Sequence, residues 1–300
     1  MKLIINKMKK NKKRHSESIV GFLFIFPALF FLAALIVYPL LNTFYLSLYK
    51  TNLINIWKFN GVNNYLNQFS SVEIWDSLKI TFIYTAGVVI GTLILGMIAA
   101  LLLNSKIKGQ SLYRSLILWP WVLSSAATVI MWRWIYSTEY GVLNDILLRL
   151  RLIGNPISWL GNTNTALLAL ILVGIWKAFP FAAVALLGGL QAIPIELYEA
   201  AKVDGASSMQ RWRHISLPGL RNVILILVIL ETVWWFKEFA LVNMMTEGGP
   251  LRSTETITIR AFKYGFKFFE FGNAAALGII IFLICLIIMI IYIKAIPQEE

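Results

Sequence analysis

The chain has 300 residues, of which 58% are hydrophobic and 14% are charged, whereas about a quarter of an average soluble domain is charged. Its net charge is +12, but the basic residues stand in short blocks beside apolar runs. No basic stripe is interleaved with base-stacking aromatic residues, which argues against nucleic-acid binding. The apolar residues gather in stretches of about twenty, the length that crosses a hydrocarbon core. These features exclude a water-soluble globular domain and predict spanning helices.

The chain offers no set of side chains for a disulfide or a metal site. Cys285 is the only cysteine, and it lies within the last apolar run, where inert packing is expected. The two histidines, His15 and His214, both lie in basic segments. We therefore expect no metal site and no cofactor bound by this chain.

Six apolar runs follow one another along the chain, and each is expected to form a transmembrane helix. The runs cover residues 19–41, 80–103, 115–136, 166–187, 222–242 and 274–294. They predict an all-α polytopic membrane protein with one transmembrane domain at 19–294, a basic tail at 1–18 and a second tail at 295–300. In the second run Gly87 and Gly91 are four residues apart, a spacing typical of close helix contact.

The positions of Lys and Arg predict that both termini are cytoplasmic. A cleaved signal peptide usually has a shorter apolar core and a small-residue cleavage site, so the first run is expected to remain as a span. Lys and Arg are denser in the segments that this topology places inside than in the longer outside segments. The basic tail alone carries Lys2, Lys7, Lys9, Lys10, Lys12, Lys13 and Arg14.

Residues 260–269 have a pattern typical of a helix in the membrane interface. Arg260, Lys263 and Lys267 recur at helical spacing, and phenylalanines occupy another face. An ordinary solvated loop is the alternative interpretation.

The segment 190–218, between the fourth and fifth runs, predicts a helix–turn–helix elbow on the cytoplasmic side. Residues 196–203 are good helix formers, and Leu197, Ala200 and Ala201 form a narrow small-residue stripe. Gly205 permits a turn, and Ser207 with Gln210 has the spacing of a capping box. Pro218 is expected to end the second helix, with Arg211 and Arg213 solvated or facing a partner. The elbow is either a docking element or a loop that packs only on its own chain.

The elbow also resembles the EAA motif of the permease subunits of binding-protein-dependent ABC importers. Glu199-Ala200-Ala201, three residues, Gly205, nine residues, Ile215, one residue and Leu217-Pro218 match the motif at every position. The surrounding LQAIPIELYEAAKVDGAS is similar to the carbohydrate-uptake branch, which includes the maltose and glycerol-phosphate permeases. Other stretches agree, so the resemblance covers about residues 20–295. Unlike larger relatives, this chain has no large outside domain.

The resemblance implies a type I importer permease in the bacterial cytoplasmic (inner) membrane. Its implied partners are a second homologous permease in a heterodimer, two ATP-binding subunits and an extracytoplasmic solute-binding protein, besides membrane lipid and the sugar. ATP and Mg would bind to the ATPase subunits, and this chain, which lacks the G-x-x-x-x-G-K-[ST] phosphate loop, is not expected to be an enzyme. The residues expected to couple to the ATPase are Glu199, Ala200, Ala201, Asp204, Gly205, Ile215, Leu217 and Pro218.

Ionisable residues within the runs predict a path for the sugar, because such residues are costly in a membrane and usually face a cavity. Glu231, Trp234, Trp235 and Glu238 would share one helix face. Aromatic rings stack on sugars, and polar groups bond their hydroxyls. The expected pathway consists of Trp176, Lys177, Phe179, Glu231, Trp234, Trp235 and Lys237. Alternatively, Lys177 pairs structurally with Glu231 and the tryptophans only pack.

Two other functions compete with the importer. A secondary transporter would account for the charges within the runs, but no internal repeat is evident and the elbow would go unexplained. A membrane scaffold would not depend on a soluble ligand-binding partner. Within the importer interpretation, the sequence does not distinguish a monosaccharide, an oligosaccharide, a sugar acid or glycerol phosphate, nor the permease that holds it.

Overall fold

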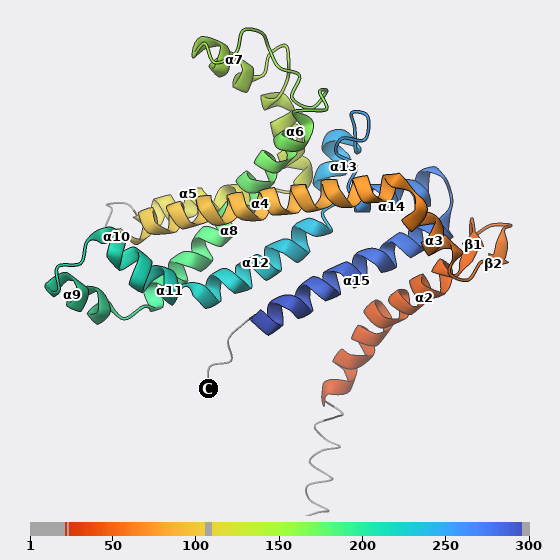
Figure 1. Cartoon of the computed structure of the whole chain (residues 1–300), viewed down its shortest axis with the longest axis horizontal. Coiled ribbons are helices and arrows are strands. Elements are labelled where there is room, and N and C mark those ends of the chain that lie inside the picture. The colour runs from red at the N-terminus through yellow and green to blue at the C-terminus, as the bar shows by residue number, and fades with distance from the viewer. Residues whose placement is uncertain (1–21, 23, 106–109, 296–300) are drawn as a thin grey trace, which may run out of the picture.

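The computed structural model describes residue 22 and residues 24–105 and 110–295. The predicted basic tail 1–18, the start of the first predicted span and the C-terminal residues 296–300 lie outside this range. Within it the protein is helical apart from one small β-hairpin (Figure 1). The hairpin joins β1 (Tyr49–Thr51) to antiparallel β2 (Trp57–Phe59).

Four uninterrupted helices in the described part of the chain are long and apolar enough to cross a membrane. The first contains the π-helical turn η1 (Ala33–Val37) and α2 (Tyr38–Ser47). The four cover Phe24–Ser47, Val72–Asn104 (α4), Ala166–Ala192 (α8) and Phe271–Lys294, the last within α15 (Phe271–Ala295).

Two further crossings are bent. Helix α5 (Gln110–Val122) meets α6 (Ser125–Ile135) at 95°. The helix Ser208–Gly219 meets α12 (Arg221–Phe236) at 61°. With each bent pair counted as one span, the structure has the six predicted spans.

The expected single helices over 115–136 and 222–242 are wrong in detail. Pro120 lies inside α5, where it removes a helical N–H and clashes with the preceding turn. Ser124 then starts α6 as its N-cap, its Oγ accepting from Ala127 N at 3.2 Å. Helix α12 ends at Phe236, and a new helix, α13 (Ala240–Thr246), begins after three non-helical residues.

The helix Ser208–Gly219 of the second bent pair consists of α10 (Ser208–Arg211), η2 (Trp212–Ser216) and α11 (Leu217–Gly219). The remaining helices lie in the connections between spans. They are α3 (Asn63–Ser70), α7 (Val142–Arg149), α9 (Ile195–Val203), α14 (Ile257–Phe262) and η3 (Lys263–Lys267). In Figure 1, α9 and α10 lie at one end of the long helices, the hairpin and α3 lie at the other end, and α6 and α7 rise away from them.

Helices α4 and α8 pack so closely that glycine is required on α4. A Cβ at Gly87 would lie 2.9 Å from Ile171 Cδ1, and one at Gly91 would overlap the side chain of Ile175. A Cβ at Gly96 would lie 2.9 Å from Ala182 Cβ and 3.2 Å from the backbone nitrogen of Ala183. The predicted close contact of Gly87 and Gly91 with another helix is confirmed, and Gly96 extends it.

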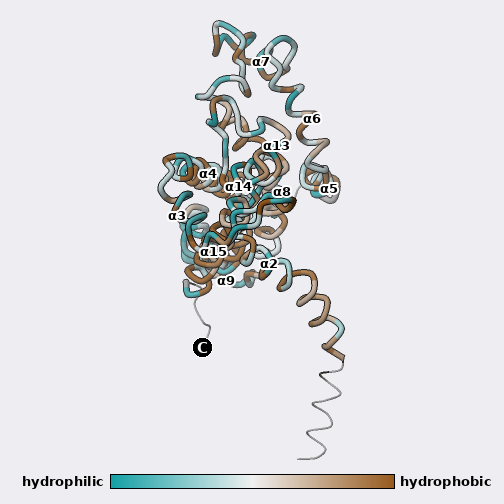
Figure 2. Tube along the Cα trace, turned by 90° about the vertical axis from the view of Figure 1, so that its right-hand side faces the viewer, coloured by the Kyte–Doolittle hydropathy of each residue, from teal (hydrophilic) through white to brown (hydrophobic). Residues whose placement is uncertain are grey.

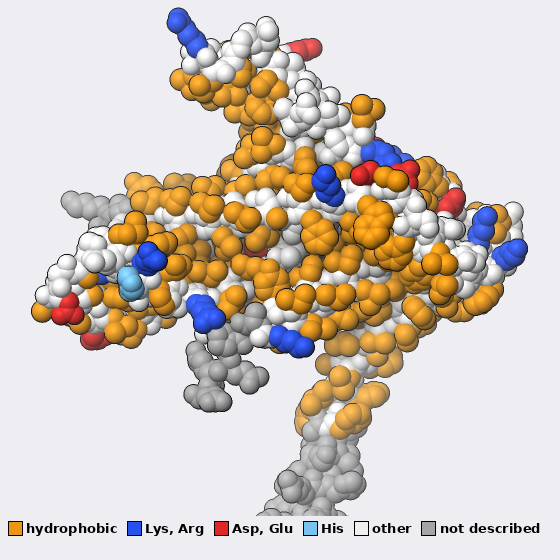
Figure 3. Space-filling view, in the orientation of Figure 1, with side chains coloured by type: hydrophobic (Ala, Val, Ile, Leu, Met, Phe, Trp, Pro, Cys, Tyr) orange, Lys and Arg blue, Asp and Glu red, His pale blue; other side chains and the backbone are white. Residues whose placement is uncertain are grey.

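Apolar side chains cover much of the outside of the long helices as well as the core. Figure 3 shows hydrophobic side chains over most of the visible face, and Figure 2 shows the projecting first helix as predominantly hydrophobic. Tyr84, Leu170 and Trp235 are buried between α4, α8 and α12, while Phe24 and Ile130 are exposed. Hydrophobic surface on both sides of a helix is expected when its outer face contacts lipid.

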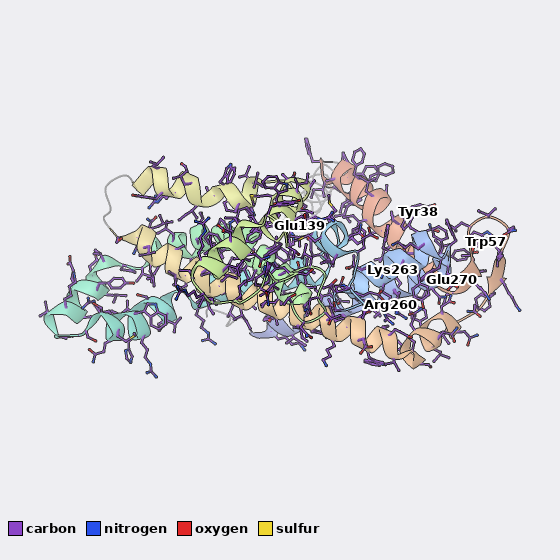
Figure 4. The ribbon with its side chains drawn as sticks, turned by 90° about the horizontal axis from the view of Figure 1, so that it is seen from above. Tyr38, Trp57, Glu139, Arg260, Lys263 and Glu270 are labelled. Atoms are coloured by element: carbon purple, nitrogen blue, oxygen red, sulfur yellow. The ribbon has the colours of Figure 1, made fainter. Side chains whose placement is uncertain are left out.

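The residues 260–267 form a helix, α14 followed by η3, but two of its three basic side chains, those of Arg260 and Lys263, face the protein, and only Lys267 is exposed. Arg260 is only 7% exposed, and its guanidinium lies 3.5 Å from the Glu255 carboxylate and 3.8 Å from that of Glu73. Lys263 Nζ also donates to Glu255, at 2.5 Å. Figure 4 shows Arg260 and Lys263 close together and remote from Trp57 on the hairpin. The expected placement of this basic face at the membrane surface is therefore wrong for Arg260.

The α4–α8 contact generates a stability prediction. We expect Gly96→Ala to lower the thermal unfolding temperature in detergent, because its methyl group meets backbone atoms and overpacking typically costs about 1–3 kcal/mol. The matched control is Gly188→Ala in α8, where a Cβ would meet nothing within 4 Å. The control should be neutral or gain up to about 1 kcal/mol from helix propensity. Equal unfolding temperatures for the two variants would contradict this packing.

Candidate functional site

A cavity of about 610 Å³ lies where the two bent crossings meet α8. Its walls come from the end of α5 and the start of α6, from the middle of α8, and from residues 230–241. This volume is within the range of small-molecule sites, which are mostly apolar with a few polar groups. The lining residues with ring or charged side chains are Trp121, Lys177, Phe181, Glu231, Trp234, Trp235, Glu238 and Phe239.

The cavity brings together four of the seven residues expected along the sugar path. These four are Lys177, Glu231, Trp234 and Trp235. The other three do not line it. Trp176 packs edge-on against Trp132 with ring centroids 5.6 Å apart, Phe179 is half-buried, and Lys237 is exposed at the end of α12.

The two tryptophans of α12 have different environments. Trp235 is 4% exposed, packs edge-on against Tyr84, and donates from Nε1 to Glu231 Oε2 at 2.7 Å. Trp234 is 62% exposed and also lines the cavity. Glu238 lies beyond the end of α12, so the expected helix face of four residues does not form, although all four line the cavity. Glu238 Oε1 accepts from Leu241 N at 2.8 Å and caps α13.

Lys177 bonds to the backbone of the bent crossing. Its Nζ donates to the Leu123 carbonyl oxygen at 2.6 Å. No carboxylate of the described residues lies within ion-pair distance of Lys177, so the alternative pairing with Glu231 is wrong. The break between α5 and α6 leaves carbonyl groups without helical donors, and Lys177 supplies one donor there.

The sequence analysis missed the part of the cavity contributed by the bent crossing. Trp121 stacks on Phe181 with ring centroids 5.8 Å apart and an angle of 19° between the rings. Ser124 and Ser125 add hydroxyl groups to the lining. The available signal was Pro120 within an apolar run, because proline in a spanning helix often marks a kink.

The elbow consists of two short helices joined by a tight turn, as predicted. Gly205 has φ +77°, the left-handed conformation that favours glycine. Ser207 Oγ accepts from Gln210 N at 3.3 Å, and Ser207 N donates to Gln210 Oε1 at 2.7 Å, which confirms the capping box. The second helix ends at Gly219, one residue beyond Pro218 where it was expected to end, and the 61° bend into α12 follows. The π-helical turn η2 ends at Ser216, two residues before Pro218.

Three hydrogen bonds hold the elbow in shape. Tyr198 OH and Ser216 Oγ, 2.9 Å apart, join α9 to η2. Ala206 N donates to Ala201 O at 2.8 Å, and Arg211 donates to Ala206 O at 2.5 Å. Arg211 is therefore half-buried and stabilises the turn itself, while Arg213 is exposed as expected.

The surface of the elbow has no covering within the described chain. Helix α9 has no buried residue, and Val203 and Met209 are 88% and 69% exposed. Glu199 is exposed and makes no hydrogen bond or ion pair with any described residue. Among the eight residues expected to couple to the ATPase, Ala201 and Ile215 are half-buried. The other six are exposed: Glu199, Ala200, Asp204, Gly205, Leu217 and Pro218.

The chain matches a known family and curated relatives along most of its length. Residues 92–296 match the family described as the binding-protein-dependent transport system inner membrane component. The trehalose/maltose transport system permease protein MalF of Thermococcus litoralis is 35% identical, over 95% of this chain and 96% of that protein. The sulfoquinovosyl glycerol transport system permease protein SmoG of Agrobacterium fabrum is 34% identical, over 95% and 92% of the two chains.

Solved structures share the fold. A bacterial ABC transporter involved in the import of the acidic polysaccharide alginate has a TM-score of 0.81 at 18% identity, over 95% of this chain and 98% of that chain. The bacterial alginate ABC transporter in complex with alginate pentasaccharide-bound periplasmic protein has a TM-score of 0.79. The predicted type I importer permease fold is thus confirmed.

The family match, the similarity over nearly the full length and the shared fold lead to one conclusion. This chain belongs to the family of inner-membrane permease components of binding-protein-dependent ABC transport systems.

Proposed function

We propose that this permease carries a sugar or oligosaccharide across the membrane after delivery by an extracytoplasmic binding protein. The observation that carries the sugar assignment is the cavity of about 610 Å³ with its aromatic and polar lining. The relatives named for trehalose/maltose and sulfoquinovosyl glycerol support it. Family membership disfavours the ion-driven transporter and the scaffold.

The chemistry of the lining suits a sugar. The stacked Trp121 and Phe181 and the exposed ring of Trp234 offer apolar faces for the C–H side of a pyranose. Ser124 and Glu238 offer oxygen atoms to sugar hydroxyls. The proposed path thus includes Lys177, Glu231, Trp234 and Trp235 from the sequence analysis and leaves out Trp176, Phe179 and Lys237, which do not line the cavity.

A second homologous permease is proposed to complete the cavity. Trp121, Leu230 and Trp234 line it, yet each is about half exposed or more in this chain. A polar site inside a membrane must be shielded from lipid, because lipid cannot bond its polar groups. A second six-span subunit placed against these residues would close the site and form the heterodimer.

The elbow is proposed to seat in one of two ATP-binding subunits, where ATP and Mg would bind. Glu199, the exposed face of α9 and Met209 supply an unpaired charge and apolar contacts for that subunit. The helices on either side of the elbow, α8 and α12, both reach the cavity. A movement of the elbow would therefore shift Lys177 and Trp234 relative to each other, and ATP would bias the populations of the two arrangements.

A double substitution tests the docking of the elbow. In Glu199→Ala with Gly205→Pro, the charge is lost and proline cannot adopt φ +77° or donate the Gly205 N–H to Lys202 O. We expect a tagged permease purified in detergent to retain the second permease and to recover at most about a tenth of the ATPase, a loss of about 1.4 kcal/mol or more in binding. Mass spectrometry of the co-purified chains measures both.

The control for this test is Glu139→Ala, the same change at an exposed position on the turn between α6 and α7. It should recover the ATPase as the unchanged protein does. Recovery of this chain alone, unaffected by the elbow substitutions, would exclude the importer assembly and the role of the elbow.

The role of Trp234 is tested by transport in reconstituted vesicles with the binding protein present. Trp234→Ala should reduce sugar uptake about two- to thirteenfold, because loss of one aromatic contact costs about 0.5–1.5 kcal/mol. Trp134→Ala, which removes an equally exposed ring outside the cavity, is the matched control and should transport normally. Unchanged uptake by Trp234→Ala in an intact complex would remove Trp234 from the path. Trp235→Ala is unsuitable, because its buried ring contributes to the core.

A further inference from the structure

The charged groups of the cavity are predominantly acidic. Glu231 and Glu238 both line it, whereas Lys177 is the only Lys or Arg among its described lining residues. Glu231 is 7% exposed, and its Oε2 accepts from the indole of Trp235. Glu238 Oε1 is bound by Leu241 N. Each carboxyl group is fixed in place by one hydrogen bond and keeps acceptor oxygen for a ligand.

The single cation is already engaged with the protein. Lys177 Nζ lies 2.6 Å from the Leu123 carbonyl oxygen, which anchors the ammonium at the bend between α5 and α6. Glu238 lines the same cavity as Lys177. An anionic ligand would have to draw Lys177 away from the Leu123 carbonyl, and it would lie beside two carboxyl groups without another positive partner among the described lining residues.

Family membership does not decide the charge of the substrate. One relative is named for trehalose/maltose, and one solved neighbour imports the acidic polysaccharide alginate. A preference at the permease itself would come from the side chains of its own cavity. In this chain, the aromatic surfaces of Trp121, Phe181 and Trp234 accept the apolar face of any pyranose, so the charged groups decide among sugars.

We infer that the cavity selects uncharged saccharides and rejects saccharides that carry carboxylate groups. This inference rests on the proposed function of the cavity as the sugar path. Glu231 and Glu238 accept hydrogen bonds from the hydroxyls of an uncharged sugar, and they repel a uronate, because like charges in a poorly solvated site are unfavourable. Glu231 and Glu238 are thus specificity-determining residues for the transported class.

The experiment uses the complete transporter in lipid nanodiscs without the binding protein, so that only the permease selects. It is titrated with maltotriose and with trigalacturonate, which match in length and differ in charge, and binding is followed by intrinsic tryptophan fluorescence. Trp121, Trp234 and Trp235 line the cavity and report occupancy. We expect maltotriose to bind at least about tenfold more tightly.

The double variant Glu231→Gln with Glu238→Gln isolates the charge. Glutamine keeps an acceptor oxygen for the Trp235 indole and for Leu241 N, so the local structure is retained. We expect the preference for maltotriose to fall about tenfold, mainly through tighter binding of trigalacturonate. Glu139→Gln, an exposed change outside the cavity, should keep the original preference, and the melting temperature of each variant checks its folding.

Either of two results would overturn the inference and leave the proposed sugar path standing. In the first, the wild-type transporter binds trigalacturonate at least as tightly as maltotriose. In the second, the glutamine variant keeps the wild-type preference for maltotriose. If neither saccharide alters the fluorescence of the wild type, the cavity is not the sugar path, and the proposed site fails together with the inference.

Discussion

A backbone carbonyl group without a hydrogen-bond donor costs roughly several kcal/mol inside a bilayer. At the bend between α5 and α6, Lys177 supplies a donor to one such group, the carbonyl of Leu123. The 95° bend between α5 and α6 opens the wall of the cavity, and it also interrupts the helical hydrogen bonds. Lys177 supplies a donor to the freed carbonyl, and the carbonyl supplies a partner for an ammonium group in apolar surroundings. This one bond thus satisfies both the carbonyl at the bend and the ammonium group of α8, and both groups line the cavity.

Two of the helices that line the cavity, α8 and α12, also lead to the elbow. Helix α8 carries Lys177 and Phe181 and leads into α9, while α12 leaves the elbow and ends beside Trp235. Sixteen residues of α12 span about 24 Å, so a rigid rod joins the two sites. The bond between Tyr198 and Ser216 ties together the two helices of the elbow, so they would move as one unit. The close α4–α8 contact at Gly87, Gly91 and Gly96 gives this movement a fixed support.

The sequence predicted the features that depend on local pattern. Apolar runs located the spans, Gly87 and Gly91 located a close contact, and the spacing of Ser207 and Gln210 located the capping box. Features set by distant contacts were missed. Hydropathy is equally high on both sides of a bend, so it could not show that α12 ends at Phe236 or that Lys177 bonds to Leu123.

The residues 260–267 illustrate the same limit. Helical spacing correctly predicted a helix, but a pattern cannot show whether a charge faces lipid headgroups or a carboxylate from another segment. Arg260 faces Glu73, which lies far away in the sequence. Within the cavity, the sequence identified residues on α8 and α12 but not Trp121, because only the bend brings its ring to Phe181.

The exposed apolar surface of the elbow affects how long the protein survives in the cell before assembly. Val203 lies in the connection after α8, and no described residue covers it or Met209. An apolar surface of this kind in water is the feature by which chaperones and proteases recognise incomplete proteins. If the elbow binds an ATP-binding subunit as proposed, a copy without that subunit would be short-lived, and the abundance of the permease would follow the supply of the subunit.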